Sequence, residues 1–478
     1  MLHWLQHETA GLLTLSAAGI TLLLLLIIRF KVEPFIALLV AGLLVALGAG
    51  VPVEKIVSGN QSLLESGFGS ILGHITVIIG LGTLLGGLLE ASGGAEVLTR
   101  RLLAAFGERR APLAMGLSGF VFGIPVFFDI GIFVLAPLVY VAARSSGRSI
   151  LLFCLPLLAG LSVTHAFLPP HPGPVALAGL LQVDVGWLIL MGLACGVPAW
   201  AVGLLYANWL GKRLFLPVPE EMLAAARVAA QERSGTGGGT SDGADPEPPR
   251  DEVTREPSLA LVATIIAIPL VLILSATFGG MLLPDGSAVL GVVTFLGNPA
   301  VALTITVLLA MWLLGLRRGM TRAEIAELTG ASLRPVGMIL LVVGAGGFFG
   351  AVLAATGVGK AVAGTLSSAG LPLVVLAYVI SCALRVAQGS ATVAIVTTGG
   401  IVAPLLAEAE YSQPQLALIA MAIAAGSIIA SHVNDGGFWI VSRYFGIPVK
   451  ETLQSWTVLE TVLSVSGFAT ALLLGLVV

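Results

Sequence analysis

Long runs of apolar residues recur along the entire chain, and they limit its possible folds more than any other feature. About 20 apolar residues in a helix cross the hydrocarbon core of a bilayer. The first run, 12–28, is followed by Arg29 and Lys31 and not by a small-residue cleavage site, so we expect a retained span. We expect further spans at about 33–50, 71–90, 150–178, 185–207, 258–278, 298–316, 335–357, 413–440 and 455–478.

The composition supports this interpretation. Hydrophobic residues make up 57% of the chain and charged residues only 10%, whereas about a quarter of a soluble domain is charged. The net charge of −3 gives no general attraction to nucleic acid. Cys154, Cys195 and Cys382 all lie inside apolar runs, which excludes a disulfide framework and a zinc cluster. The sequence therefore predicts an all-α polytopic membrane protein.

Two further apolar stretches, 112–143 and 371–407, are each long enough for two helices but contain Gly, Pro or polar residues near the middle. Basic residues collect on the cytoplasmic side of membrane proteins. With the N-terminus outside and both stretches treated as re-entrant hairpins, nearly all of the 23 basic residues face the cytoplasm. Two complete spans in place of each hairpin fit the charges equally well. The charges thus predict the sidedness and leave the hairpins open.

A polar segment, 217–257, separates two halves of the chain. Its first part, 217–233, could form an amphipathic helix, and the remainder is rich in Gly, Pro, Asp and Glu, as in a flexible cytoplasmic linker. We favour a plain tether over a regulatory docking segment. The predicted domains are therefore a first membrane repeat, 1–216, this linker, and a second membrane repeat, 258–478.

The two halves share a repeated segment. Residues 71–102 align without a gap with residues 335–366, and Gly80 pairs with Gly344. The distribution of basic residues orients these two segments in opposite directions. Inverted repeats with helices broken near the midplane are typical of secondary transporters.

One ionisable residue lies in the middle of the first long stretch. Asp129 follows Gly123 and Pro125, where a helix must break. Charges inside apolar segments cost several kcal/mol and usually mark functional sites. Asp129 could carry a proton or orient a substrate, or it could cap the returning helix, where its charge suits the helix dipole. Both roles could hold together.

The span at 150–178 contains a predicted break. Four prolines between positions 169 and 174 forbid a continuous helix. Unwound backbone inside a membrane is tolerated only beside protein or water, so we expect the break to line a cavity. A histidine there could bind a substrate or titrate near neutral pH, or could be satisfied by backbone carbonyls. The candidate residues are Thr164, His165, His171 and Gly173.

The second half contains two matching breaks. The start of a half-helix in the middle of 371–407 is a ready anion site, and its candidates are Gly389, Ser390 and Thr392. Arg385, one turn earlier, could pair with a substrate carboxylate, but a structural ion pair with Asp129 or Asp435 is favoured. Oxygens in the break at 430–437 could take a hydroxylated substrate, a proton or a sodium ion, and its candidates are Ser431, His432, Asn434 and Asp435. Together these donors suit a small hydroxylated anion.

Other classes of membrane protein lack their sequence signatures. An intramembrane metal enzyme could be drawn from His165, His171, His432 and Asp435, but no HExxH motif is present. A channel needs a continuous polar lining, and most spans are uniformly apolar. The chain has no Walker motif for ATP-driven pumping. We expect neither a metal nor a cofactor.

The chain resembles the gluconate permease family, the gluconate:proton symporters of bacterial inner membranes. The resemblance covers most of the chain outside 217–257. It rests on GIPVFFDIGIFVLAPL (123–138), LSVTHAFLPPHPGP (161–174), ALRVAQGSATVAIVTTGG (383–400), SHVNDGGFWIVSRYFG (431–446) and ETLQSWTVLET (451–461).

The resemblance implies a secondary transporter that imports D-gluconate or a related sugar acid with protons. The wider superfamily includes dicarboxylate carriers with two re-entrant hairpins and an elevator-type transport domain. By this resemblance, 12–50 and 258–316 would form a scaffold that holds a homodimer, and 71–207 and 335–478 would supply the transport elements. Another small hydroxy acid, or coupling to sodium, is the alternative.

Proton coupling needs a group that binds a proton on one side of the membrane and releases it on the other. Among the buried carboxylates we place Asp129 ahead of Asp435 for this role. His165 is the rival, because the unperturbed imidazole already titrates near neutral pH. Asp435, beside His432 and Asn434, could instead serve substrate binding.

Overall fold

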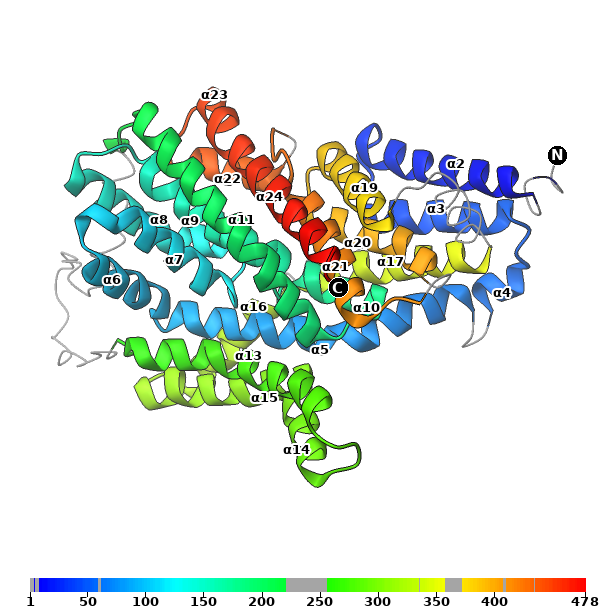
Figure 1. The fold of residues 1–478 in the computed structure, drawn as a ribbon, viewed down its shortest axis with the longest axis horizontal. Coiled ribbons are helices and arrows are strands. Elements are labelled where there is room, and N and C mark those ends of the chain that lie inside the picture. The colour runs from blue at the N-terminus through cyan, green and yellow to red at the C-terminus, as the bar shows by residue number, and fades with distance from the viewer. Residues whose placement is uncertain are drawn as a thin grey trace, which may run out of the picture.

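The structure, a computed structural model, describes residues 4, 8–58, 62–220, 256–334, 336–356, 372–406, 410–433 and 435–478. Most of the predicted linker at 217–257, and the candidate residue Asn434, lie outside these described residues. Within them all regular structure is helical (Figure 1). Nine of the described helices are long and apolar enough to cross a membrane. The prediction of an all-α polytopic membrane protein is confirmed.

The first half begins with two apolar helices and continues through a long helix into a bundle. Ser62 caps that long helix by accepting a hydrogen bond from the backbone of Glu65, and Asp184 caps the last helix in the same way through Trp187. The helices are α2 (Thr9–Ile28), α3 (Pro34–Gly48), α4 (Val53–Val57), α5 (Leu63–Ala91), α6 (Gly94–Phe106), α7 (Ala111–Gly123), α8 (Phe128–Ser146), α9 (Leu151–Phe167), α10 (Pro172–Leu181) and α11 (Val185–Arg213).

The second half repeats much of this order. Its helices are α13 (Leu259–Leu282), α14 (Ala288–Gly297), α15 (Pro299–Ala310), α16 (Arg322–Leu333), α17 (Val336–Ala355), α19 (Leu373–Gln388), α20 (Ala391–Leu406), α21 (Gln413–Ile428), α22 (Gly436–Tyr444), α23 (Val449–Thr452) and α24 (Val458–Gly475). Most predicted spans match these helices within a few residues, but α5 begins eight residues before the predicted span at 71–90 and α11 ends six residues beyond the predicted span at 185–207. Helices α14 and α16 were not predicted, because each is too short to cross a bilayer.

Each of the two long apolar stretches forms a pair of helices joined by a short break. Helices α7 and α8 are separated by residues 124–127, and α19 and α20 by Gly389 and Ser390. At 1.5 Å per residue, the 13 residues of α7 and the 16 residues of α19 extend only about 20 and 24 Å. The hydrocarbon core is about 30 Å thick, so these arms are short for complete spans.

The structure contains a break in each of the two spans that the sequence predicts to be broken. Residues 168–171, which include a cis peptide bond between Pro169 and Pro170, separate α9 from α10. This break is narrower than expected, since Thr164 and His165 remain in the last turn of α9. Residues 429–435 separate α21 from α22.

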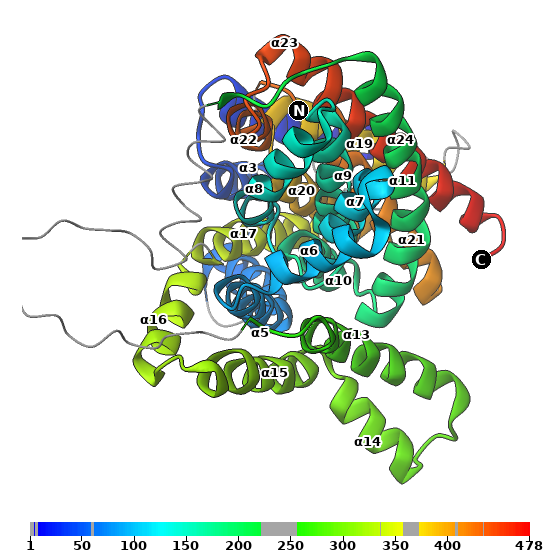
Figure 2. The same cartoon turned by 90° about the vertical axis from the view of Figure 1, so that its left-hand side faces the viewer.

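Helices α5 and α17, which carry the repeated segment, pack directly on each other. A Cβ atom at Gly67 would lie 2.9 Å from the Cα of Phe348, and one at Gly344 would lie 2.5 Å from the ring of Phe68. Only glycine allows this close approach. Helices α13 and α15 lie along one side of α5, and α14 projects away from the rest of the molecule (Figures 1 and 2).

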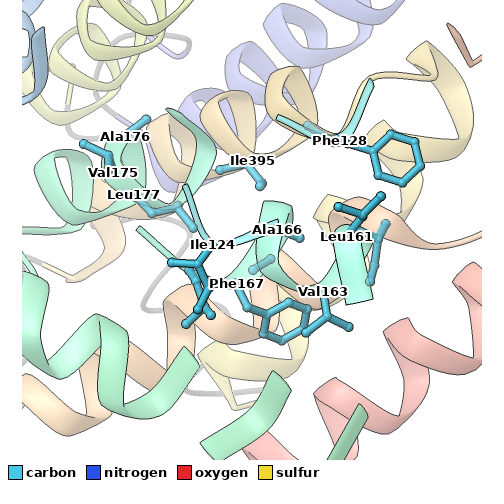
Figure 3. Packing of buried hydrophobic residues seen from close by; sticks show 14 of the residues in the cluster. Ile124, Phe128, Leu161, Val163, Ala166, Phe167, Val175, Ala176, Leu177 and Ile395 are labelled. Carbon is cyan, nitrogen blue, oxygen red and sulfur yellow. The ribbon is translucent and has the colours of Figure 1, made fainter. Parts of the chain in front are cut away.

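The centre of the molecule is the α9–α10 segment. In the Leu151–Leu181 stretch, 94% of the most apolar window is buried. Side chains from three distant parts of the sequence pack around it, among them Phe128 before it and Ile395 after it (Figure 3). The breaks in the first and second halves are therefore held against one core.

Candidate functional site

A cavity of about 430 Å³ lies where the breaks of the two halves meet. This volume is in the range of about 300–1,000 Å³ typical of small-molecule sites. Helices α8, α20 and α22 all begin at its wall, so backbone N–H groups and the positive ends of helix dipoles converge there. The lining residues are Phe127, Phe128, Asp129, Ser162, His165, Ile339, Arg385, Gly389, Ser390, Ala391, Thr392, Ile428, Asp435, Gly436, Gly437, Ile440, Trp456 and Glu460.

Asp129 is in the first turn of α8, where its charge suits the helix dipole. Its side chain is exposed, whereas the sequence led us to expect a buried carboxylate. The prediction of burial is wrong for this conformation. The reason is that the break at 124–127 presents the start of α8 to the open cavity instead of packing it into the core.

The break between α19 and α20 is built from small and hydroxylated residues. Gly389 ends α19 in the left-handed conformation, with φ of 81°, which glycine adopts without strain. Ser390 then accepts a hydrogen bond from the backbone N–H of Val393 at 3.4 Å, at the start of α20. Gly389, Ser390 and Thr392 all line the cavity, as the sequence predicted for an anion site.

The predicted structural ion pair is present. Arg385, only 4% exposed, donates to the carboxylate of Asp435 at 2.5 Å and also to the carbonyl oxygen of Gly389. Arg385 therefore pairs with Asp435 and not with Asp129. The pair joins the break between α19 and α20 to the break before α22.

Asp435 is hydrogen-bonded on both carboxylate oxygens. One oxygen caps α22 by accepting from the N–H of Gly437 at 3.0 Å, and the other accepts from Ser431 as well as from Arg385. Ser431 in turn accepts a hydrogen bond from the indole of Trp456 at 2.8 Å. This network fixes the second break from three helices.

The two histidines of the first break have different surroundings. His171 is buried, and its Nε2 makes a hydrogen bond of 2.6 Å with the carbonyl oxygen of Gly123, which ties the α9–α10 break to the end of α7. His165 lines the cavity and packs against His171 at 4.9 Å between ring centres. The Nδ1 atom of His165 is buried and has no hydrogen-bond partner among the described residues.

Several predicted site residues do not line the cavity. Thr164 is buried and bonds to carbonyl oxygens of its own helix, while a Cβ at Gly173 would press on Ile395. His432 bonds to the carbonyl oxygen of Ala430. These residues shape the breaks without lining the cavity. The predicted site residues that do not line it are Gly123, Pro125, Thr164, His171, Gly173, Ser431 and His432.

Sequence reasoning missed three polar residues of the wall. Ser162 lies on α9 one turn before His165, and Trp456 and Glu460 lie on neighbouring turns at the start of the last span. A π-helical turn at Leu453–Thr457 precedes α24, and such turns often occur at functional sites. The signal for Glu460 was available, because an ionisable residue inside an apolar run is a candidate by default.

Among the described residues no three His, Cys, Asp or Glu side chains gather as a metal site would require.

Two solved structures share this fold. MtrF of Neisseria gonorrhoeae aligns with a TM-score of 0.63 and 16% identity over 98% of this chain and 96% of that chain. The YdaH transporter of Alcanivorax borkumensis, described as having an unusual topology, aligns with a TM-score of 0.61 and 14% identity over 93% of this chain and 98% of that chain. At these identities the similarity concerns the fold alone.

Closer relatives are found by sequence. The chain is 42% identical to the inner membrane permease YgbN of Escherichia coli K12, over 96% of this chain and 98% of that protein. It is 39% identical to a gluconate permease of Pseudomonas aeruginosa, over 99% of both. It is 38% identical to the high-affinity gluconate transporter of Escherichia coli K12, over 98% of this chain and all of that protein. The pattern of the GntP family permeases matches residues 11–477, so this chain is a transporter that belongs to the GntP family of permeases.

Proposed function

We propose that this permease imports D-gluconate or a related sugar acid, together with protons, across the inner membrane of a bacterium. The names of its relatives, an inner membrane permease and two gluconate transporters, support the substrate class and the location. The observation that carries the proposal is the convergence of the N-termini of α20 and α22 at one cavity. Such a site favours a small anion.

The substrate carboxylate would lie on the N-terminus of α20, at Ser390 and Thr392, with the backbone of Gly436 and Gly437 opposite. Its hydroxyl groups would face the polar side chains of the other wall, which are Asp129, Ser162 and His165. A site that hydrogen-bonds hydroxyl groups rejects analogues that lack them, because its own polar groups are then left unpaired.

We further propose that the protein works as an elevator with inverted repeats. Helices α7, α19 and α20 are short for complete spans, which suits re-entrant hairpins, and the breaks of both pairs meet at the cavity. The domain boundaries at 1–216, 217–257 and 258–478 follow from the repeat. In this proposal a scaffold that includes the spans at 12–50 and 258–316 holds a homodimer, while 71–207 and 335–478 contribute the elements that move with the substrate.

A different hydroxy acid is the alternative substrate. One relative, 36% identical over 95% of this chain, is named the Gnt-II system L-idonate transporter of Escherichia coli K12. L-Idonate and gluconate carry the same carboxylate and hydroxyl groups with different stereochemistry, so the same cavity chemistry suits both.

Uptake by the purified protein in proteoliposomes tests this function. Labelled gluconate, L-idonate and deoxy analogues are compared with glucose, with and without an inward pH gradient or a sodium gradient. We expect pH-driven accumulation of a sugar acid, weak competition by deoxy analogues and no competition by glucose. Glucose competing as well as gluconate would contradict an anion site, and accumulation driven by sodium alone would contradict proton symport.

A further inference from the structure

Glu460 is the most buried carboxyl group at the cavity. It is 2% exposed and lies in the first turn of α24, four residues after Trp456, and both side chains face the cavity. Asp129, by contrast, is exposed at the same cavity. One carboxyl group of the site, Glu460, is therefore buried, and another, Asp129, is exposed. Carboxyl groups in such different environments usually have different roles.

The surroundings of Glu460 contain little that stabilises a negative charge. The hydroxyl of Ser162 lies beside it, and its Oε1 atom has no hydrogen-bond partner among the described residues. The other ionisable groups that line the cavity with it are Asp129, His165, Arg385 and Asp435. Of the remaining helices packed on α24, α21 has no charged residue and α11 has them only in its last turn.

Arg385 is already engaged. Its guanidinium donates to Asp435 and to the carbonyl oxygen of Gly389, and Asp435 carries the compensating negative charge. Glu460 therefore has no cation of its own. A buried carboxylate without a cation is unfavourable, and a nearby substrate anion makes it more so.

We propose that Glu460 carries the co-transported proton; this inference rests on the proposed function. A proton from the outer solution binds the Glu460 carboxylate through the cavity, and the resulting neutral acid lets the substrate anion bind. The two cross the membrane together. On the inner side the O–H bond breaks, the proton goes to water and the anion leaves, so that one proton and one anion enter in each cycle.

The competing assignment is Asp129. Its side chain is more exposed than that of Glu460, so a negative charge on Asp129 keeps more contact with water. Asp435 is unsuited, because its charge is fixed by Arg385, Ser431 and the N-terminus of α22.

The experiment compares Glu460→Gln with Asp129→Asn in proteoliposomes that contain a pH-sensitive dye. An inward gradient of one pH unit supports accumulation of about tenfold for one proton per anion, and wild-type protein should approach it. In Glu460→Gln we expect accumulation to fall to about onefold, with gluconate-driven proton influx lost and gluconate exchange retained. The control is Glu451→Gln, the same substitution at a half-buried position outside the cavity wall.

If Glu460→Gln transports poorly, a measurement of gluconate binding still tests the proposal. Wild-type affinity for gluconate should weaken as the pH rises, by up to about tenfold per unit, and affinity in Glu460→Gln should not depend on pH. Normal accumulation and proton influx in Glu460→Gln would overturn the inference, as would loss of both in Asp129→Asn alone. If wild-type protein itself shows no pH-driven accumulation, the proposed function fails, whatever Glu460 does.

Discussion

At the scale of single residues, the site separates side chains that build it from those that face the substrate. Asp435, Ser431 and Trp456 form a connected network that holds Arg385 and starts α22. His171 ties two breaks together through the carbonyl oxygen of Gly123. The sequence identified the breaks from their prolines, glycines and polar residues, because these act locally. It left open whether Arg385 pairs with Asp129 or with Asp435, since Arg385 and Asp435 are 50 positions apart in sequence.

Replacing Asp435 by Asn should damage both stability and binding. The substitution leaves the buried charge of Arg385 without its partner, which costs about 3–5 kcal/mol of unfolding free energy. With Arg385 and the start of α22 no longer held, we expect gluconate affinity to fall at least about tenfold, or about 1.4 kcal/mol. Thermal unfolding in detergent and a direct binding titration measure the two effects.

Asp129→Asn is the matched comparison, because Asp129 is exposed and makes no ion pair within the described part of the chain. Its stability should stay within about 0.5 kcal/mol of wild type.

One result would contradict the prediction for Asp435→Asn. Tighter gluconate binding in that variant would show that Asp435 competes with the substrate for Arg385 and does not organise the site.

At the scale of elements, the two helix pairs and the two broken spans are the features that make a cavity in an otherwise apolar bundle. The sequence located them from clusters of Pro, Gly and polar residues, which disfavour a continuous helix, whereas single prolines such as Pro137 and Pro156 remain inside helices. The structure adds the lengths of the arms and the meeting of α8, α20 and α22 at one point. It also restricts the first break to residues 168–171, because α9 packs tightly enough to keep its last turn helical.

Cysteine labelling tests whether each helix pair returns to the side from which it enters. In a Cys382→Ala background, cysteines at Arg110 and Ser146 should both react with an impermeant reagent from the cytoplasmic side, because α7 and α8 would enter and leave there. Cysteines at Pro372 and Glu410 should both react from outside. The measurement uses right-side-out and inside-out vesicles. Two complete spans would return both ends of a pair to one side as well, so reaction of the two ends from opposite sides would contradict any arrangement in which each pair returns to its own side.

At the scale of the whole molecule, glycines on α5 and α17 face the elements that carry the cavity. Gly82 and Gly86 on α5 meet Pro170 and the backbone of Pro125, while Gly346 on α17 meets Val396. In the gapless alignment of the repeats, Gly82 pairs with Gly346. The repeated segments therefore pack closely, through glycines, on the break-containing elements of their own halves.

Gly86→Ala tests this close packing. A Cβ at Gly86 would lie 2.5 Å from the carbonyl oxygen of Pro125, so the contact must shift. We expect a loss of about 1–3 kcal/mol in stability and a reduced transport rate. Gly73→Ala, on the same helix, is the control, since nothing lies within 4 Å of a Cβ there, and it should leave transport unchanged. Equal effects of the two substitutions would mean that helix propensity, and not this contact, is responsible.

The sequence by itself determined most of the membrane-spanning helices, the approximate positions of the breaks and the family. These follow from chain-local requirements, because each span must bury its own backbone polar groups and each proline removes a donor at its own position. Only the tertiary structure decided that Arg385 pairs with Asp435, that Asp129 faces the open cavity and that Glu460 is buried beside Ser162. Burial and pairing depend on which helices pack together, and residues far apart in sequence acquire those neighbours only in the folded bundle.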